Sequence, residues 1–211
     1  MSGRAAYLLR RFRRDESGAT LVEFAMVIVV FLLILFGLID FGRYAFHLVA
    51  TERAMHVAAR VAAVRPPACA GVPAIHTRSA SSTTAPEFGT SCNAGADICA
   101  NAGTITCAGS AGDATSAEIW GLVQGTMPND ATIADLRFSY GYDANLGFLG
   151  GPYVPVVTVE LSNVTFRFVS PLAALVALAG GAADPALGAD ITLPAMSVSL
   201  PGEDLAQGAD G

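Results

Sequence analysis

A single carboxylate, that of Glu23, lies inside a long apolar stretch near the N-terminus. Between Ala19 and Ile39 the other interruptions are Thr20 and Gly37. A carboxylate in the hydrocarbon of a bilayer costs on the order of 2.5–3.5 kcal/mol, so a functional role is the first hypothesis for it. The chemistry open to Glu23 is pairing with a positive charge. The alternative is that it reaches the nearby membrane surface and has no role.

Four cysteines form the second group of reactive side chains, and all of them follow the apolar stretch: Cys69, Cys92, Cys99 and Cys107. If this part of the chain faces an oxidising compartment, disulfides can persist, and four cysteines allow three pairings between which the sequence does not choose. Zinc and free thiols are the alternatives. The cysteine spacings contain no CxxC pair and the three histidines lie elsewhere, so we expect disulfides and no metal.

The sequence contains no recognisable catalytic constellation. GxSxG, HExxH and phosphate-binding-loop patterns are all missing from it. The cysteine region shows no partner base that would activate a nucleophilic thiol. We therefore expect a protein that is not an enzyme and has no cofactor.

The apolar stretch itself predicts a transmembrane helix over 19–41. The 21 residues from Ala19 to Ile39 would span about 31 Å as a helix, which matches the hydrocarbon thickness of a bilayer. A secretory signal peptide is a weaker interpretation, because the apolar region is too long and no small-residue cleavage site follows it promptly.

Charge predicts the orientation of this helix. The leader, residues 1–18, carries five arginines, and four of them form its topology signal: Arg10, Arg11, Arg13 and Arg14. Positive charge beside a first membrane helix keeps that end in the cytoplasm, so the remainder should face outward. Residues 19–211 hold seven arginines against sixteen acidic residues, which argues against a nucleic acid partner.

The residues around Glu23 resemble a known processing site. Gly18 precedes Ala19, Glu23 is the fifth residue after Gly18, and the aromatic Phe24 follows at once. This pattern resembles the cleavage site of type IV pilin-like proteins, and the aromatic after the glutamate resembles their Flp and tight-adherence branch. The segments FGLIDFGRY at 36–44 and ATERAMHVAARVAAV at 50–64 resemble TadE-like proteins.

Beyond the membrane the same helix should continue as an amphipathic extension over 42–65, ended by Pro66-Pro67. Residues 66–113 are rich in small residues and contain all the cysteines, so we expect an irregular region there. A small α+β domain is expected over 114–203, followed by a tail at 204–211.

Within the small domain a short helix is expected over 116–124, with Thr115 or Ser116 as its N-cap. Alternating apolar residues then predict strands at 136–142, 157–168 and 191–200. The phase of alternation slips at Ser162-Asn163 and again at Pro194, which predicts a bulge or bend at the first and an edge strand or bulge at the second. Between these strands, 171–179 predicts a short apolar helix.

The fold class that follows is α+β. A long N-terminal transmembrane helix continues into a small outer domain with an antiparallel sheet of three or more strands and short helices.

The TadE-like resemblance implies a minor pseudopilin, cut after Gly18 by a prepilin peptidase. It implies a single-pass protein of the inner membrane, with a cytoplasmic N-terminus and an outer C-terminal domain. Its partners would be other pilins or pseudopilins and the assembly platform of a Flp-type pilus or related secretion apparatus used in adhesion. The alternative is an uncleaved membrane protein whose outer domain binds a ligand or partner as a sensor or adhesin.

Cleavage is testable on the intact protein. In cells that contain the peptidase, mass spectrometry of the purified chain should show the loss of residues 1–18 and a new N-terminus at Ala19. Recovery of full-length chains alone from such cells would contradict the pseudopilin interpretation.

Overall fold

The structure is a computed structural model, and it describes residues 18–82, 85–182, 184, 186, 188–203 and 205–206. The chain divides into two compact units. Unit 1 comprises Met1–Tyr44 and Arg167–Asp190, and unit 2 comprises Ala45–Phe166 and Ile191–Gly211.

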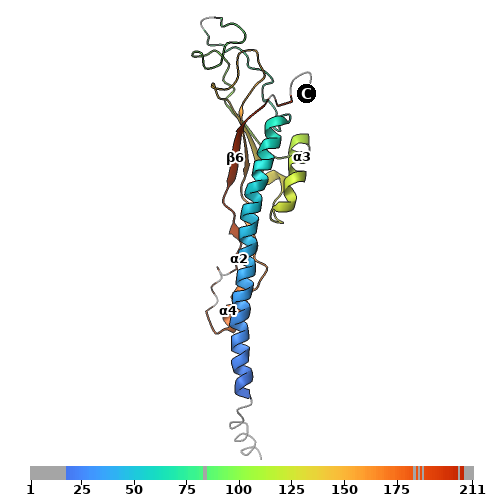
Figure 1. Ribbon diagram of the computed structural model, residues 1–211, viewed down its shortest axis with the longest axis vertical. Helices are drawn as coiled ribbons and strands as arrows, with labels where there is room; N and C mark the ends of the chain where they lie inside the picture. The colour runs from blue at the N-terminus through green and yellow to red at the C-terminus, as the bar shows by residue number, and fades with distance from the viewer. Residues whose placement is uncertain are drawn as a thin grey trace, which may run out of the picture. The chain divides into compact units, whose positions relative to one another are not determined.

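One helix of 46 residues, α2 (Ala19–Val64), contributes to both units (Figure 1). At 1.5 Å per residue it is about 69 Å long, roughly twice the thickness of a bilayer core. The last turn closes with a hydrogen bond from the Arg65 backbone N–H to the Val61 carbonyl (3.0 Å). Pro66 and Pro67 follow and end the helix, since proline disfavours helical geometry in the residue before it. The predicted long helix is confirmed.

Unit 2 contains a four-stranded antiparallel sheet with the order β1-β2-β3-β6. Its strands are β1 (Thr104–Ala108), β2 (Leu136–Gly141), β3 (Val156–Leu161) and β6 (Met196–Pro201). The register pairs Phe138 with Val159 and Val159 with Val198. The α+β class with an antiparallel sheet is confirmed, and the sheet has one strand more than the three that the alternation indicated.

The core of unit 2 lies between the sheet and the C-terminal half of α2. The helix face that enters the core is made almost wholly of small residues, and the buried ones are Thr51, Ala54, Met55, Ala58, Ala59, Ala62 and Ala63. Large sheet residues complement it, with Phe138 and Tyr140 fully buried. Small residues let a helix backbone approach a sheet closely, so large side chains from the sheet can fill the space between them.

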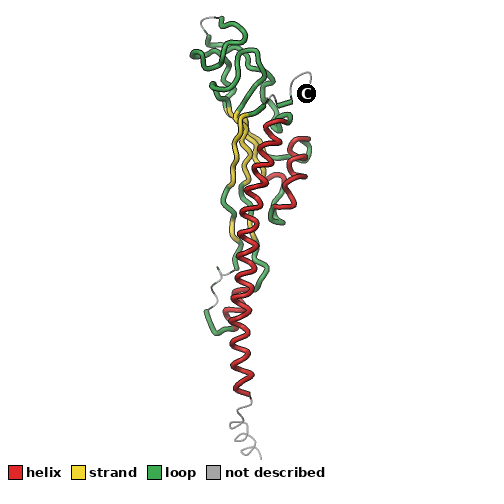
Figure 2. The backbone as a smooth tube through the Cα atoms, viewed as in Figure 1, coloured by secondary structure: helices red, strands yellow, loops and turns green. Residues whose placement is uncertain are grey.

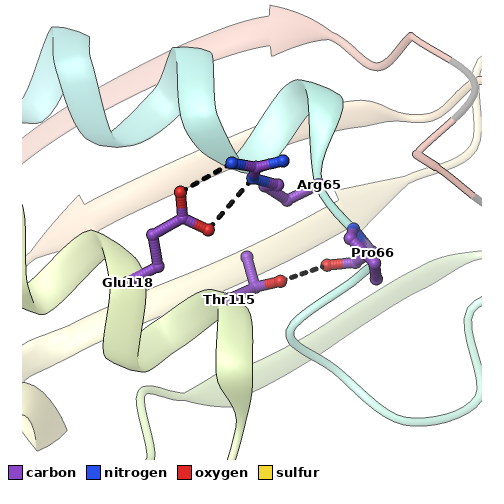
Figure 3. A network of polar contacts seen from close by, with 4 residues as sticks. All are labelled: Arg65, Pro66, Thr115 and Glu118. Atoms are coloured by element: carbon purple, nitrogen blue, oxygen red, sulfur yellow. Dashed lines mark hydrogen bonds and ion pairs between the residues drawn. The ribbon is translucent and has the colours of Figure 1, made fainter. Parts of the chain in front are cut away.

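A second helix, α3 (Ala114–Val123), packs in the same unit and is tied to the end of α2 (Figure 3). The guanidinium of Arg65 donates two hydrogen bonds to the Glu118 carboxylate, at 3.0 and 2.8 Å. The Thr115 hydroxyl donates to the Pro66 carbonyl at 2.8 Å. The predicted N-cap was wrong: the cap is Asp113, whose carboxylate accepts from the Ser116 N–H at 2.7 Å.

Both predicted phase slips coincide with breaks between strands. After β3 the chain bends at Asn163, whose φ of 63° lies in the left-handed region, and the short strand β4 (Thr165–Phe166) follows. Asparagine adopts this region more readily than most residues. Further along the chain, β5 (Ile191–Thr192) pairs with β4. Pro194 lies between β5 and β6, and β6 forms an edge of the main sheet.

The region between α2 and β1 consists, in its described residues, of loops crossed by isolated β-bridges (Figure 2). Two disulfides are present, Cys69–Cys107 and Cys92–Cys99, with Cα–Cα distances of 5.6 and 5.2 Å. The first joins the chain just after α2 to strand β1. The second, with Leu149, forms a small buried cluster among the loops.

The two disulfides should stabilise unit 2 unequally. By loop-closure entropy, the Cys69–Cys107 bridge, with a sequence separation of 38, contributes about 3.9 kcal/mol, and Cys92–Cys99, with a separation of 7, about 2.4 kcal/mol. Chemical denaturation of the Cys69→Ser/Cys107→Ser pair should therefore show the larger loss of unfolding free energy. The Cys92→Ser/Cys99→Ser pair is its matched control, and an equal or larger loss in that control would contradict the expectation.

Candidate functional site

The N-terminal end of α2 carries the residues of the predicted processing site. Gly18 is exposed and immediately precedes the first helical residue, Ala19. Glu23 and Phe24 are both exposed, Phe24 to 66%. Within the described part of the chain, Glu23 makes no hydrogen bond or ion pair. The four leader arginines, Arg10, Arg11, Arg13 and Arg14, lie outside the described residues.

The chain does not bury the apolar half of α2. None of its most apolar 18-residue window is buried, although the helix is long and apolar enough to cross a membrane. Most of its large side chains are exposed, among them Leu21, Met26, Phe31 and Leu38, whereas one face, which includes Ile28, Leu32 and Phe36, is half-buried. A helix that is apolar on every side and is not buried by protein requires another apolar environment.

One acidic side chain at the end of this apolar surface is buried. The Asp40 carboxylate is 1% exposed and accepts two hydrogen bonds within unit 1. Arg43, one turn further along the helix, donates from Nη1 to Oδ1 at 3.3 Å, and the Ser170 backbone N–H donates to Oδ2 at 3.0 Å. Asp40 therefore links α2 to a segment that lies 130 residues further along the sequence.

An aromatic contact lies beside the Asp40 bond. The rings of Phe41 and Phe168 meet edge-on, with centroids 5.7 Å apart and an interplanar angle of 70°. The spacing of Asp40 and Arg43 predicts an ion pair across one turn, which is present. Sequence reasoning missed the contribution of Ser170 and Phe168, because no local pattern indicates a contact over so long a separation.

His76 and two cysteines bring their potential ligand atoms within 4.8 Å of one another, as a metal site would require. The sulfurs of Cys92 and Cys99 are bonded to each other, however, and a disulfide offers no thiolate ligands. The His76 ring is buried, and its Nε2 accepts a hydrogen bond from the Val154 N–H at 3.2 Å. This group is therefore a packed histidine beside a disulfide.

His76 should make the stability of unit 2 depend on pH. Burial lowers the pKa of His76 below its ordinary value of 6.5, so the unfolded chain binds the proton more tightly than the folded chain. The stability that the neutral His76 contributes to unit 2 is fully present above about pH 6.5, and it is lost as the pH falls toward the pKa of His76 in the folded chain. Between pH 7.5 and pH 5.5, the unfolding temperature of His76→Gln should fall by less than that of the wild-type protein. His56→Gln, which changes an exposed histidine, is the control and should behave like the wild type. An equal fall in unfolding temperature in all three proteins would contradict the role of His76.

The Asp40 contact should control the mobility of the segment that it holds. Asp40→Ala leaves the Ser170 N–H without its acceptor, and hydrogen bonds to charged groups contribute about 1.5–3 kcal/mol. Hydrogen exchange at Ser170 in the solubilised full chain should accelerate on the order of tenfold or more. Arg43→Ala, which removes the 39%-exposed arginine from the ion pair with Asp40, should change the exchange rate at Ser170 little. Unchanged exchange in Asp40→Ala would show that other contacts hold the segment.

Comparison with protein families supplies one match. Residues 18–60 match the model of the TadE-like protein family, a range that begins at the exposed Gly18 and covers the apolar half of α2 and most of its extension. Comparison with curated proteins and with solved structures found no match. The chain therefore contains a TadE-like protein domain at residues 18–60.

Proposed function

We propose that this protein is a TadE-like minor pseudopilin. A prepilin peptidase cuts it after Gly18, and the mature chain is a structural or assembly component of a Flp-type pilus or related secretion apparatus. The observation that carries the proposal is the coincidence of the TadE-like match at 18–60 with a long helix whose most apolar 18-residue window has no buried residue. The role is structural, in keeping with the generally non-enzymatic character of this pilin-type family.

The proposed membrane arrangement follows from the distribution of charge. The apolar half of α2 crosses the inner membrane, the basic leader lies in the cytoplasm, and unit 2 lies outside. Two disulfides in unit 2 suit an oxidising compartment and support this orientation. Its partners are the peptidase, neighbouring pilins or pseudopilins, and the assembly platform.

Glu23 has a specific role in this proposal. Cleavage would create an α-amino group at Ala19, which is largely protonated near neutrality. In α2 the two residues lie four positions apart, or about 6 Å along the axis, and Glu23 has no partner in the described chain. The new amine can neutralise this carboxylate within one chain or across two neighbouring subunits.

A polar contact between helices can fix the register of an assembly in lipid. Helices gain little from the hydrophobic effect when they leave lipid for one another, so packing and polar contacts decide how they associate. A Glu23–amine pair between staggered subunits would also remove part of the cost of a carboxylate in the membrane.

Replacement of Glu23 tests this role in living cells. Glu23→Ala should insert at least as well as wild type, yet cells that produce it should form few or no fibres and few cross-links between neighbouring subunits. Glu52→Ala, which changes an exposed glutamate further along α2, is the matched control and should assemble normally. The comparison uses only chains cut after Gly18 and requires equal protein levels.

Two results would contradict these proposals in different ways. Normal fibres from cleaved Glu23→Ala would limit Glu23 to peptidase recognition or to no role. Normal fibres from cells that lack this protein altogether would exclude the pilus function itself.

A further inference from the structure

Unit 1 contains a second apolar element that lies far from the N-terminus in sequence. It is the excursion of residues 167–190, which leaves the domain after β4 and returns to it at β5. Its described helix, α4 (Leu172–Leu178), has the sequence LAALVAL and lies beside the apolar half of α2 (Figure 1). We propose that 168–182 is inserted into the outer leaflet of the membrane, beside the helix that spans it. This inference rests on the proposed membrane anchor.

The surface of α4 is apolar on every side. Leu172 and Leu175 are buried, at 4% and 8% exposure, while Leu178 on the same helix is 72% exposed. Val169, just before the helix, is 74% exposed. An ordinary surface helix turns a polar face to water, and α4 has no polar side chain to present. Its outer face therefore fits lipid hydrocarbon.

Charged residues mark the two ends of the excursion. Arg167 and Asp190 form an ion pair, with Nε and Oδ2 3.5 Å apart, and their side chains are 66% and 54% exposed. Between them, residues 168–183 contain no Asp, Glu, Lys, Arg or His, and Asp184 is the one charged residue of 168–189. A charged pair at the base of the excursion suits a position at the level of the lipid headgroups, with Asp184 near that level and the uncharged part, 168–182, inserted below it.

The Asp40 contact fixes where the excursion meets α2. Ser170 is bonded to Asp40, and Asp40 directly follows the apolar run that ends at Ile39. The seven residues of α4 extend about 10 Å, less than the roughly 15 Å of hydrocarbon in one leaflet. The element therefore enters one leaflet without crossing the bilayer.

The backbone at the end of α4 is suited to an apolar environment. The N–H groups of Ala179, Gly180 and Gly181 donate to carbonyls of the last turn, at distances of 3.0, 3.1 and 3.0 Å. Gly180 has a φ of 82°, the left-handed geometry that such a helix end requires. Hydrogen-bonded backbone is a condition for entry into hydrocarbon, where water supplies no partners.

Fluorescence quenching by lipids with brominated acyl chains tests the insertion. Trp120 is the chain's single tryptophan, so Trp120→Phe provides a background for new probes. The probes are Leu178→Trp and Val169→Trp, both at exposed positions, in the full chain reconstituted into phosphatidylcholine vesicles with and without bromine. Phe31→Trp reports on the α2 anchor. Leu122→Trp, at a 57%-exposed leucine on the short helix α3, is the matched control.

We expect Leu178→Trp and Val169→Trp to lose fluorescence in brominated vesicles as Phe31→Trp does, with emission shifted to shorter wavelength, while Leu122→Trp is unaffected. If Phe31→Trp is quenched and both excursion probes behave like Leu122→Trp, the insertion is excluded and the anchor stands. If Phe31→Trp is not quenched either, the anchor is wrong and the insertion falls with it.

Discussion

The structure depends on a run of about 20 apolar residues in α2 that the chain itself does not bury. Burial of apolar surface contributes roughly 25 cal/mol per Å², so leaving a helix of this length exposed to water would be strongly unfavourable. A bilayer satisfies this constraint because its hydrocarbon thickness equals the length of the run and because a helix satisfies its own backbone groups. In the proposed arrangement the arginines of the leader keep the N-terminal end in the cytoplasm.

The same helix changes its packing partner after it leaves the apolar run. From Thr51 onward its buried face consists of one threonine, one methionine and five alanines, and the core that it enters also contains the large apolar residues Phe138 and Tyr140 of the sheet. Small residues are a poor source of buried area by themselves, so stability in unit 2 also depends on the sheet, the Arg65–Glu118 pair and two disulfides. One continuous helix can thus belong to an apolar environment at one end and to a folded domain at the other.

Sequence reasoning predicted the parts of the fold that local pattern encodes. The length of the apolar run and the proline pair define α2, and slips in alternation locate the breaks near Asn163 and Pro194. It did not predict β1, because five residues within a small-residue region carry too weak an alternation. Asp113 was missed as the cap of α3, and the cysteine pairing and the Asp40–Ser170 bond depend on distant contacts that only the folded chain defines. The processing residues Gly18 and Glu23 stay predictions, since their function lies in chemistry with other proteins.

The most direct test of the account is the membrane topology of the chain. Protease added to right-side-out membrane vesicles should digest the C-terminal domain of the full chain, and inverted vesicles from the same cells should protect it. Carbonate washing should leave the chain in the membrane in both preparations. Protection in right-side-out vesicles and digestion in inverted ones would reverse the orientation, and release by carbonate would contradict the membrane anchor.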